Sequence, residues 1–445
     1  MDLYEAFNAF TDVERCIIIK SDVLRLGLKF SERALEACQG RTDILFKGYR
    51  IFSYDCEETV VYGQKVPYVI FLEDGTPDGT CIQIRSSRKS PYIIDVEEDG
   101  TFALYFDSQA MGKIHFASAP LFYQQTINGI PMPALVSAHS DLLYVAANKH
   151  CDFFSQGIQC LFCDLTPHAA TQKKSETMIL RKDPELTAEV LKAALGEHCF
   201  RHIFISGGTF LKGYEGLTEV EWYAQFLEKI RKGIGCWYTA TFQIQALQDE
   251  GWKRLYDTGI PSVQPNIEVW DKGLFEMICP GKAKYVGYDE WVKRTVRAVD
   301  FWGPGNVNPN FVSGIEMAQP FGFKDVNEAV ESTLSGYDFL MSNGVLPRQG
   351  DFWCIEAGSR LAGQEPPPLE YFLKLGIGYL ELREKHRFMT CAPYTCRFDL
   401  LHGTECDFEY WHGNGPRSRK AQEAGGIVYD FKTKTSRVAG GDHGD

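Results

Sequence analysis

The sequence predicts an α/β protein whose main part is a parallel sheet built from six successive strand–helix units. From about residue 140, short apolar runs alternate with segments that have helical periodicity, and this alternation repeats six times. Like-directed strands need a crossover at each return, and segments of this length supply it as helices. Eight such units would close a full barrel, whereas this chain has six.

The strands are predicted at 142–147, 203–205, 237–242, 263–269, 307–314 and 345–347. The helices that follow them are predicted at 187–195, 221–230, 247–256, 288–299, 326–341 and 369–384. The first strand, LLYVAA, is apolar throughout, which is typical of a strand covered on both faces. The first helix places Val190, Leu191 and Ala194 on one side, as an amphipathic helix requires. The last helix follows three consecutive prolines at 366–368.

The two ends of the chain have a different pattern. Residues 1–40 are predicted to be mostly helical, and 43–117 contain short alternating runs separated by Asp-Gly pairs at 74–75, 78–79 and 99–100. Such pairs are typical of turns between antiparallel strands. We therefore expect an N-terminal α+β cap over 1–135, the strand–helix part over 136–387, and a small cysteine-rich C-terminal extension over 388–445.

Charge and hydropathy argue against two classes of partner. The chain has 46 Lys and Arg against 59 Asp and Glu, a net charge of −13 that repels a nucleic-acid backbone. Its basic runs at 85–89 and 417–420 are short. No apolar run approaches the ~20 residues of a membrane-spanning helix, and the first residues, MDLYEAFNAF, do not resemble a secretory signal. We expect a cytoplasmic protein that binds neither nucleic acid nor membrane.

Three of the 14 cysteines form a distinct group. Cys151, Cys160 and Cys163 follow the first predicted strand, and loops at the carboxyl ends of parallel strands form the active-site face. Three thiolates can hold three irons of a [4Fe–4S] cluster and leave the fourth iron open. A zinc site with His150 as fourth ligand and three inert buried thiols are the alternatives that the residues alone leave open.

The strand–helix order and this cysteine group resemble the radical S-adenosylmethionine (SAM) superfamily over about residues 120–385. The resemblance implies a partial (β/α)6 barrel. Family members usually space the cysteines three and two residues apart, whereas the first gap here has eight residues. Phe162 matches the residue that packs near the adenine. The block CPGKA at 279–283 resembles the biotin-synthase-like branch and, with PLFYQQTINGIP at 120–131, an uncharacterised group associated with nitrilase-type genes.

Further family positions follow the later strands. The segment 206–209 resembles the Gly-Gly-Glu stretch that binds the amino group of SAM, with a threonine in place of the acidic residue; a plain glycine turn is the alternative. A polar pair on the fourth strand resembles contacts to the ribose and carboxylate of SAM, and a solvated strand end is its alternative. A stretch on the fifth strand resembles the one beside the adenine. The cofactor-binding residues implied in this way are Ser206, Gly207, Gly208, Thr209, Asn266, Glu268, Gly314 and Glu316.

The resemblance implies reductive cleavage of SAM at the cluster to a 5′-deoxyadenosyl radical, which abstracts hydrogen from a small-molecule substrate. An electron donor such as flavodoxin or ferredoxin is implied as partner. Side chains at the strand ends are candidates for substrate contact, although a packed barrel interior would use the same residues. These candidates are Tyr238, Gln243, Gln245, Arg348 and Trp353.

A second cysteine group lies near the C-terminus. Cys391, Cys396 and Cys406 could hold an auxiliary iron–sulfur cluster with Cys354 or His402, hold a structural zinc, or simply be buried. For the whole chain, a zinc-dependent β/α-barrel hydrolase or lyase is the main alternative. The absence of any H-x-H or H-E-x-x-H pair among the 10 histidines disfavours it. A non-catalytic iron–sulfur carrier is the third interpretation, and the glycine pair disfavours that one.

Overall fold

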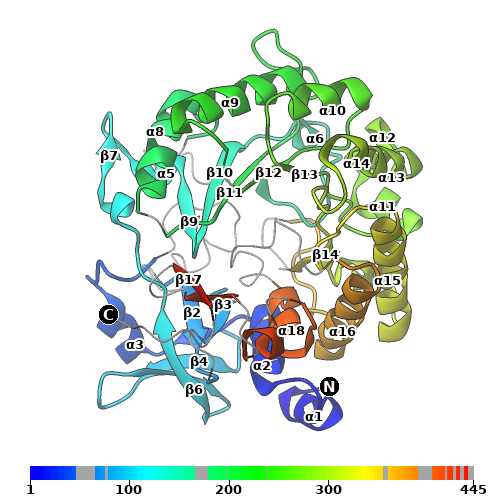
Figure 1. The fold of residues 1–445 in the computed structure, drawn as a ribbon. Helices are drawn as coiled ribbons and strands as arrows, with labels where there is room; N and C mark the ends of the chain where they lie inside the picture. Colours follow the sequence, from blue (N-terminus) through cyan, green and yellow to red (C-terminus); the bar gives the residue numbers. More distant parts are fainter. Residues whose placement is uncertain are drawn as a thin grey trace.

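The computed structural model describes residues 1–46, 66–75, 79–165, 179–197, 199–237, 239–353, 359–388, 403–415, 418–423, 427–430 and 435–438. Among these residues, no helix combines the length and the apolar character needed to cross a membrane. Figure 1 shows a curled sheet with helices along its outer side and a second sheet on its open side.

The curled sheet has the strand order β13-β12-β11-β10-β9. Four of its strands are parallel, and β9 (Ser137–His139) pairs antiparallel with β10. The parallel strands are β10 (Leu142–Asn148), β11 (His202–Gly207), β12 (Ala240–Gln243) and β13 (Ser262–Gln264). A two-stranded parallel sheet, β14 (Val312–Ser313) with β15 (Asp351–Phe352), continues the curl. An α/β fold with a half-barrel sheet is thus confirmed.

The predicted helices are present, with ends shifted by a few residues. In Figure 1 they follow the outer side of the sheet. They are α8 (Pro184–Leu195), α9 (Glu219–Ile234), α10 (Asp249–Tyr256), α13 (Tyr288–Arg297), α15 (Val326–Ser342) and α16 (Leu369–Lys385). Shorter helices that the sequence analysis did not predict are α5 (Met132–Leu135), α6 (Asp152–Ser155), α11 (Lys272–Ile278), α12 (Pro280–Tyr285) and α14 (Val299–Trp302).

The predicted strands at 263–269, 307–314 and 345–347 are wrong in their extent. In place of 263–269 the strand is Ser262–Gln264 and ends before Pro265, so Asn266 and Glu268 follow the strand and do not lie on it. Only Val312–Ser313 of 307–314 is a strand, and 345–347 is not one. The chain still runs alongside in parallel, because the amide of Leu346 donates to the carbonyl of Val307 at 3.0 Å and that of Arg348 to Pro309 at 3.1 Å. Pro309 and Pro347 have no N–H to donate, so the ladder is interrupted where a regular strand was expected.

Among its described residues, the N-terminal part contains three helices and a six-stranded, mostly antiparallel sheet of order β1-β4-β5-β6-β2-β3. The helices are α1 (Leu3–Ala9), α2 (Arg15–Leu26) and α3 (Glu32–Cys38). The strands are β1 (Lys29–Phe30), β2 (Val69–Leu72), β3 (Thr80–Gln83), β4 (Tyr92–Val96), β5 (Phe102–Phe106) and β6 (Gln109–Phe116). The predicted turn at 99–100 joins β4 to β5, with Gly100 in the left-handed region at a φ of 82°.

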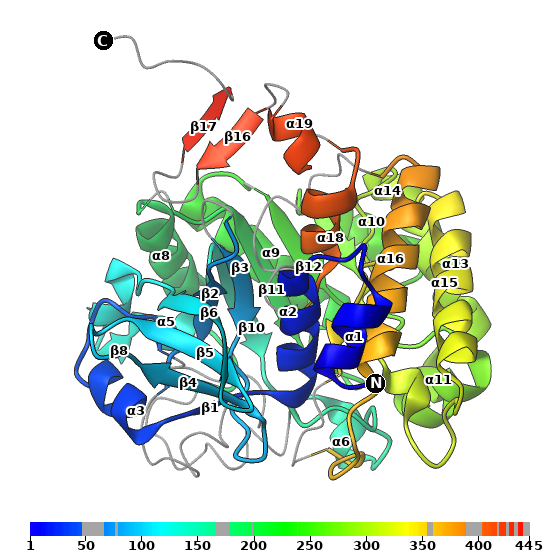
Figure 2. The same cartoon turned by 90° about the horizontal axis from the view of Figure 1, so that it is seen from below.

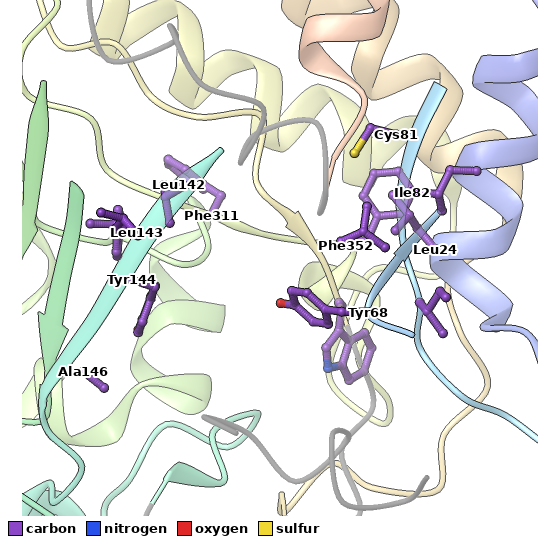
Figure 3. Packing of buried hydrophobic residues seen from close by; sticks show 14 of the residues in the cluster. Leu24, Tyr68, Cys81, Ile82, Leu142, Leu143, Tyr144, Ala146, Phe311 and Phe352 are labelled. Atoms are coloured by element: carbon purple, nitrogen blue, oxygen red, sulfur yellow. The ribbon is translucent and has the colours of Figure 1, made fainter. Parts of the chain in front are cut away.

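One continuous core joins the two sheets. Figure 3 shows Tyr68 and Phe352 between β10, which carries Leu142 and Tyr144, and the N-terminal strand that carries Ile82. The hydroxyl of Tyr68 also hydrogen bonds to Nδ1 of His139, at 2.7 Å. The N-terminal sheet therefore packs against the open side of the half barrel through side chains that are both apolar and hydrogen-bonded.

The described C-terminal residues form α18 (Glu405–His412), α19 (Arg419–Glu423) and the hairpin β16 (Ile427–Asp430)–β17 (Thr435–Val438). Figure 2 shows this hairpin at one end of the molecule and α6 at the other. Two buried ion pairs hold α18, from Lys20 to Asp407 at 2.6 Å and from Arg383 to Glu409 at 3.1 Å. The boundaries at 135 and 387 stay predictions.

Candidate functional site

A cavity of about 320 Å³ lies at the carboxyl ends of the parallel strands. It brings together twelve residues that the sequence analysis singled out, from the cysteine loop and from strands far apart in the chain. These are Cys151, Cys160, Phe162, Cys163, Ser206, Gly207, Gly208, Thr209, Gln243, Gln245, Asn266 and Glu268. Arg348 and Trp353 line the same cavity. Tyr238 lies outside the described residues.

The cysteine loop is attached to the fold on both sides. Cys151 follows β10 and precedes α6, whose first amide, that of Asp152, donates to the carbonyl of Thr209 at 2.9 Å. On the other side, the amide of Leu161 donates to the carbonyl of Ile278 at 2.8 Å. The position of the three thiols is therefore set by contacts with the ends of β11 and α11.

The three thiols have different electrostatic surroundings. Burial raises the pKa of Cys151 to about 11 and raises that of Cys163 well above its ordinary value. The pKa of Cys160 is lowered instead, because the Cys279 thiol hydrogen bonds to it and the Lys282 ammonium is nearby. Cys279 is fully buried, and the sequence analysis did not assign it to the site. It lies far along the chain, so only the family-like block around it gave any signal.

The donors at this cavity that could hold a metal centre are the three thiols. Among the described residues, no three His, Cys, Asp or Glu side chains converge closely enough to hold a single metal ion. His150, the proposed fourth zinc ligand, has its Nε2 atom 3.1 Å from Asp152 Oδ1. A cubane takes each thiolate on a different iron, so its ligands stand further apart than the ligands of one ion. Three thiols around one cavity suit that arrangement.

The glycine pair lets the end of β11 approach the cysteine loop. A Cβ atom on Gly208 would lie 2.1 Å from the carbonyl oxygen of His150 and 2.8 Å from the Cβ of Cys151. A Cβ on Gly207 would lie 2.1 Å from the hydroxyl oxygen of Tyr223. Neither glycine has a left-handed backbone, so a plain glycine turn does not explain the pair. Close packing does.

The Gly208 carbonyl already accepts two hydrogen bonds, from Tyr223 Oη at 2.7 Å and from Asn148 Nδ2 at 3.2 Å. An acidic group does lie beside the pair, although Thr209 stands at the family's acidic position. Glu219, the first residue of α9, lines the cavity and accepts hydrogen bonds from the amide of Phe210 and from Gln245 Nε2. Burial raises its pKa to about 8. The sequence analysis missed Glu219, since an acidic residue in a first helical turn is ordinary.

Asn266 and Glu268 lie in the cavity wall, so the alternative of a solvated strand end is wrong. The ammonium of Lys282 is 2.6 Å from Glu268 Oε1 and 2.8 Å from the carbonyl oxygen of Asn266. It also lies 4.7 Å from the centre of the Trp291 ring. Burial alone would lower the pKa of Lys282, but the carboxylate of Glu268 keeps it raised. Lys282 was not predicted as a site residue.

Two predicted cofactor residues are not brought to the cavity. Glu316 is buried and accepts hydrogen bonds from Thr333 Oγ1, at 2.6 Å, and from the Tyr371 hydroxyl. Burial raises its pKa. A Cβ on Gly314 would lie 2.6 Å from the Pro367 ring. These residues connect the end of β14 to α15 and the start of α16 rather than lining the site.

The second cysteine group cannot be assembled from the described residues. Cys391, Cys396, Cys354 and His402 lie outside them, and Cys406 is a half-buried residue of α18. A second metal site there stays a prediction.

No protein-family model matches the chain. The chain is 23% identical over 331 residues to bacteriochlorophyllide c C-7(1)-hydroxylase of Chlorobaculum limnaeum, a match that covers 70% of this chain and 76% of the hydroxylase.

Solved structures with a similar chain course include methylornithine synthase, at 16% identity and a TM-score of 0.39, covering 55% of this chain and 62% of that one. They also include coproporphyrinogen III oxidase of Escherichia coli, itself a radical SAM enzyme, at 10% identity and a TM-score of 0.34, covering 70% and 64%. This chain thus spans less than two thirds of either of these proteins.

Proposed function

We propose that this protein is a radical SAM enzyme that acts on a small-molecule substrate. The observation that supports this most strongly is the shared cavity. The cysteine loop, the glycine pair at the end of β11 and the polar pair after β13 all line it. Those segments are separated by tens of residues in the chain. Their convergence is what binding of one extended cofactor next to one cluster requires.

In this proposal Cys151, Cys160 and Cys163 hold the [4Fe–4S] cluster. SAM would lie along Phe162, the glycine pair and the polar pair of Asn266 and Glu268. When bound, the cluster and SAM supply reductive cleavage of the sulfonium to methionine and a 5′-deoxyadenosyl radical. The chain's own residues hold these groups, orient the substrate and exclude water.

Water exclusion is the proposed role of the N-terminal cap. A carbon radical reacts with whatever lies near it, so its site must be closed. Tyr68, which directly precedes β2 of the N-terminal sheet, accepts a hydrogen bond from Gln83 Nε2 at 3.1 Å and hydrogen bonds to His139, which lines the cavity. Phe352 and Trp353, both buried, line the cavity as well. Gln243, Gln245 and Arg348, which also line the cavity, are the proposed substrate contacts.

The first test is the production of 5′-deoxyadenosine. The protein would be purified without oxygen, reconstituted with iron and sulfide, and supplied with dithionite and SAM. We expect product from the wild type and from a Cys236→Ala control, whose cysteine is exposed, and none from Cys160→Ala. A protein that takes up one zinc per chain and no cluster would refute the proposal and favour the zinc-dependent hydrolase or lyase.

The auxiliary site is tested by the same preparation. One cluster gives about four irons per chain, and a second cluster would give more. If Cys406 is a ligand, Cys406→Ala should lower the iron content without changing the signal of the first cluster. Unchanged iron and zinc in this variant would contradict the prediction.

A further inference from the structure

The block Cys279–Lys282 packs directly onto the cysteine loop. A Cβ on Gly281 would lie 2.7 Å from the carbonyl oxygen of Ile158 and 2.7 Å from the ring of Phe153, so only glycine lets the start of α12 come this close. Cys279 is fully buried with its thiol against that of Cys160. The first turn of α12 therefore places Lys282 in the cavity wall beside the thiols.

Lys282 carries a buried positive charge at this wall. Its side chain is 11% exposed, and its ammonium is bound by Glu268 and by the Asn266 carbonyl over the face of Trp291. Cys160, Lys282 and Glu268 all line this one cavity. The ammonium and the carboxylate therefore act with opposite signs on a cluster held there, and removing either charge leaves the effect of the other.

A positive field favours the more negative member of a redox pair. Reduction adds one electron to the cluster, and charges and hydrogen bonds around the sulfurs are known to set cluster potentials. In a buried site such interactions are weakly screened. A fixed ammonium near one of three thiolate ligands thus stabilises the reduced state more than the oxidised state.

We propose that Lys282 raises the reduction potential of the cluster held by Cys151, Cys160 and Cys163, and that Glu268 holds the ammonium in place while opposing its effect. This inference rests on the proposed function, because it requires that the cluster forms at these cysteines. Lys282 is not a catalytic residue in this proposal, because it affects the reaction only through the potential of the cluster.

The test is the midpoint potential of the reconstituted cluster, measured without SAM by electron paramagnetic resonance during a redox titration. Lys282→Met should make the reduction equilibrium constant at least tenfold less favourable, a downward shift of about 59 mV for one electron. Glu268→Gln should shift the potential upward. Lys284→Met, on the exposed side of the same helix, should leave it unchanged, and Lys282→Arg should restore most of the wild-type value.

The opposite signs separate a charge effect from a disturbed fold. Local damage would alter both variants of the pair in the same direction, and that result would overturn the inference, as would equal potentials in the wild type and all four variants. If Lys282→Met does not load a cluster, the upward shift in Glu268→Gln still decides the matter. A wild type that binds no cluster would overturn the proposed function and this inference together, whereas a loaded cluster with unchanged potentials overturns this inference alone.

Discussion

Replacing Gly208 with alanine should displace the cysteine loop. The new Cβ would lie 2.1 Å from the carbonyl oxygen of His150, whereas ordinary van der Waals contact begins at 3.4 Å. The atoms it meets belong to backbone and to the Cβ of Cys151, none of which can rotate away. The end of β11 and the loop must therefore separate by about 1 Å or more.

Such a shift has a calculable cost. Two backbone hydrogen bonds join these segments, from Gly208 to the Asn148 carbonyl and from Asp152 to the Thr209 carbonyl, both at 2.9 Å. Lengthening each by 1 Å breaks it, and each is worth about 0.5–1.5 kcal/mol. We expect Gly208→Ala to lower the free energy of unfolding by about 1–3 kcal/mol, which is also the usual cost of overpacking.

The assay is urea unfolding of the protein, followed by iron analysis after reconstitution. Gly273→Ala is the matched control, because its new Cβ would meet no atom closer than Asp271 Oδ1 at 3.3 Å and it lies in a helix, where alanine is favoured. The control should be at least as stable as the wild type and load a full cluster. A Gly208→Ala protein with wild-type stability and full iron content would refute the reasoning.

Two further predictions concern buried ionisable side chains outside the cavity. Burial lowers the pKa of His202 to about 3 from 6.5, so below pH 6.5 the unfolded state binds a proton that the folded state does not. Between pH 6.5 and 5.5 the wild type should lose about 1 kcal/mol more unfolding free energy than His202→Gln, measured with urea at both values; equal losses would contradict this. Glu409→Gln removes the carboxylate facing the buried guanidinium of Arg383 and should cost about 3–5 kcal/mol. Asp338→Asn, which breaks an exposed pair with Lys385, should cost about 0–1 kcal/mol in the same experiment, and similar losses in both variants would show that burial does not govern the cost.

Sequence periodicity was sufficient for the parts of the fold that are periodic. The apolar runs at 142–147 and 203–205 and the helices after them have the expected positions because burial on both faces, or on one stripe, determines which residues occur there. The two strands on the far side of the curl were misjudged. Their prolines remove the amide donors, and hydrophobic patterning does not register a missing N–H.

In the candidate site too, the sequence predicts the residues that are close along the chain and not those that tertiary packing brings together. The three cysteines belong to one loop after one strand, so their proximity is local and the sequence predicts it. Glu219 and Lys282 reach the cavity from α9 and α12, and Cys279 lies between α11 and α12 with its thiol at Cys160. Their contacts depend on tertiary packing, for which a single sequence has no periodic signal. Conversely, Glu316 follows a strand end as a site residue would, yet it is buried against α15 and α16.

The long segment between Cys151 and Cys160 packs against the CPGK block at 279–282. The eight-residue gap, five residues longer than usual, contains α6, whose Phe153 is buried and stacks on Tyr285 of α12 with ring centres 5.9 Å apart. Tyr285 also donates to Gln156 Oε1 at 2.7 Å. A loop with the shorter spacing usual in the superfamily would have no room for this helical turn, and α12 would then have nothing to pack against at Gly281. The departure in spacing therefore creates the surface that fixes α12, and α12 in turn brings Lys282 to the thiols.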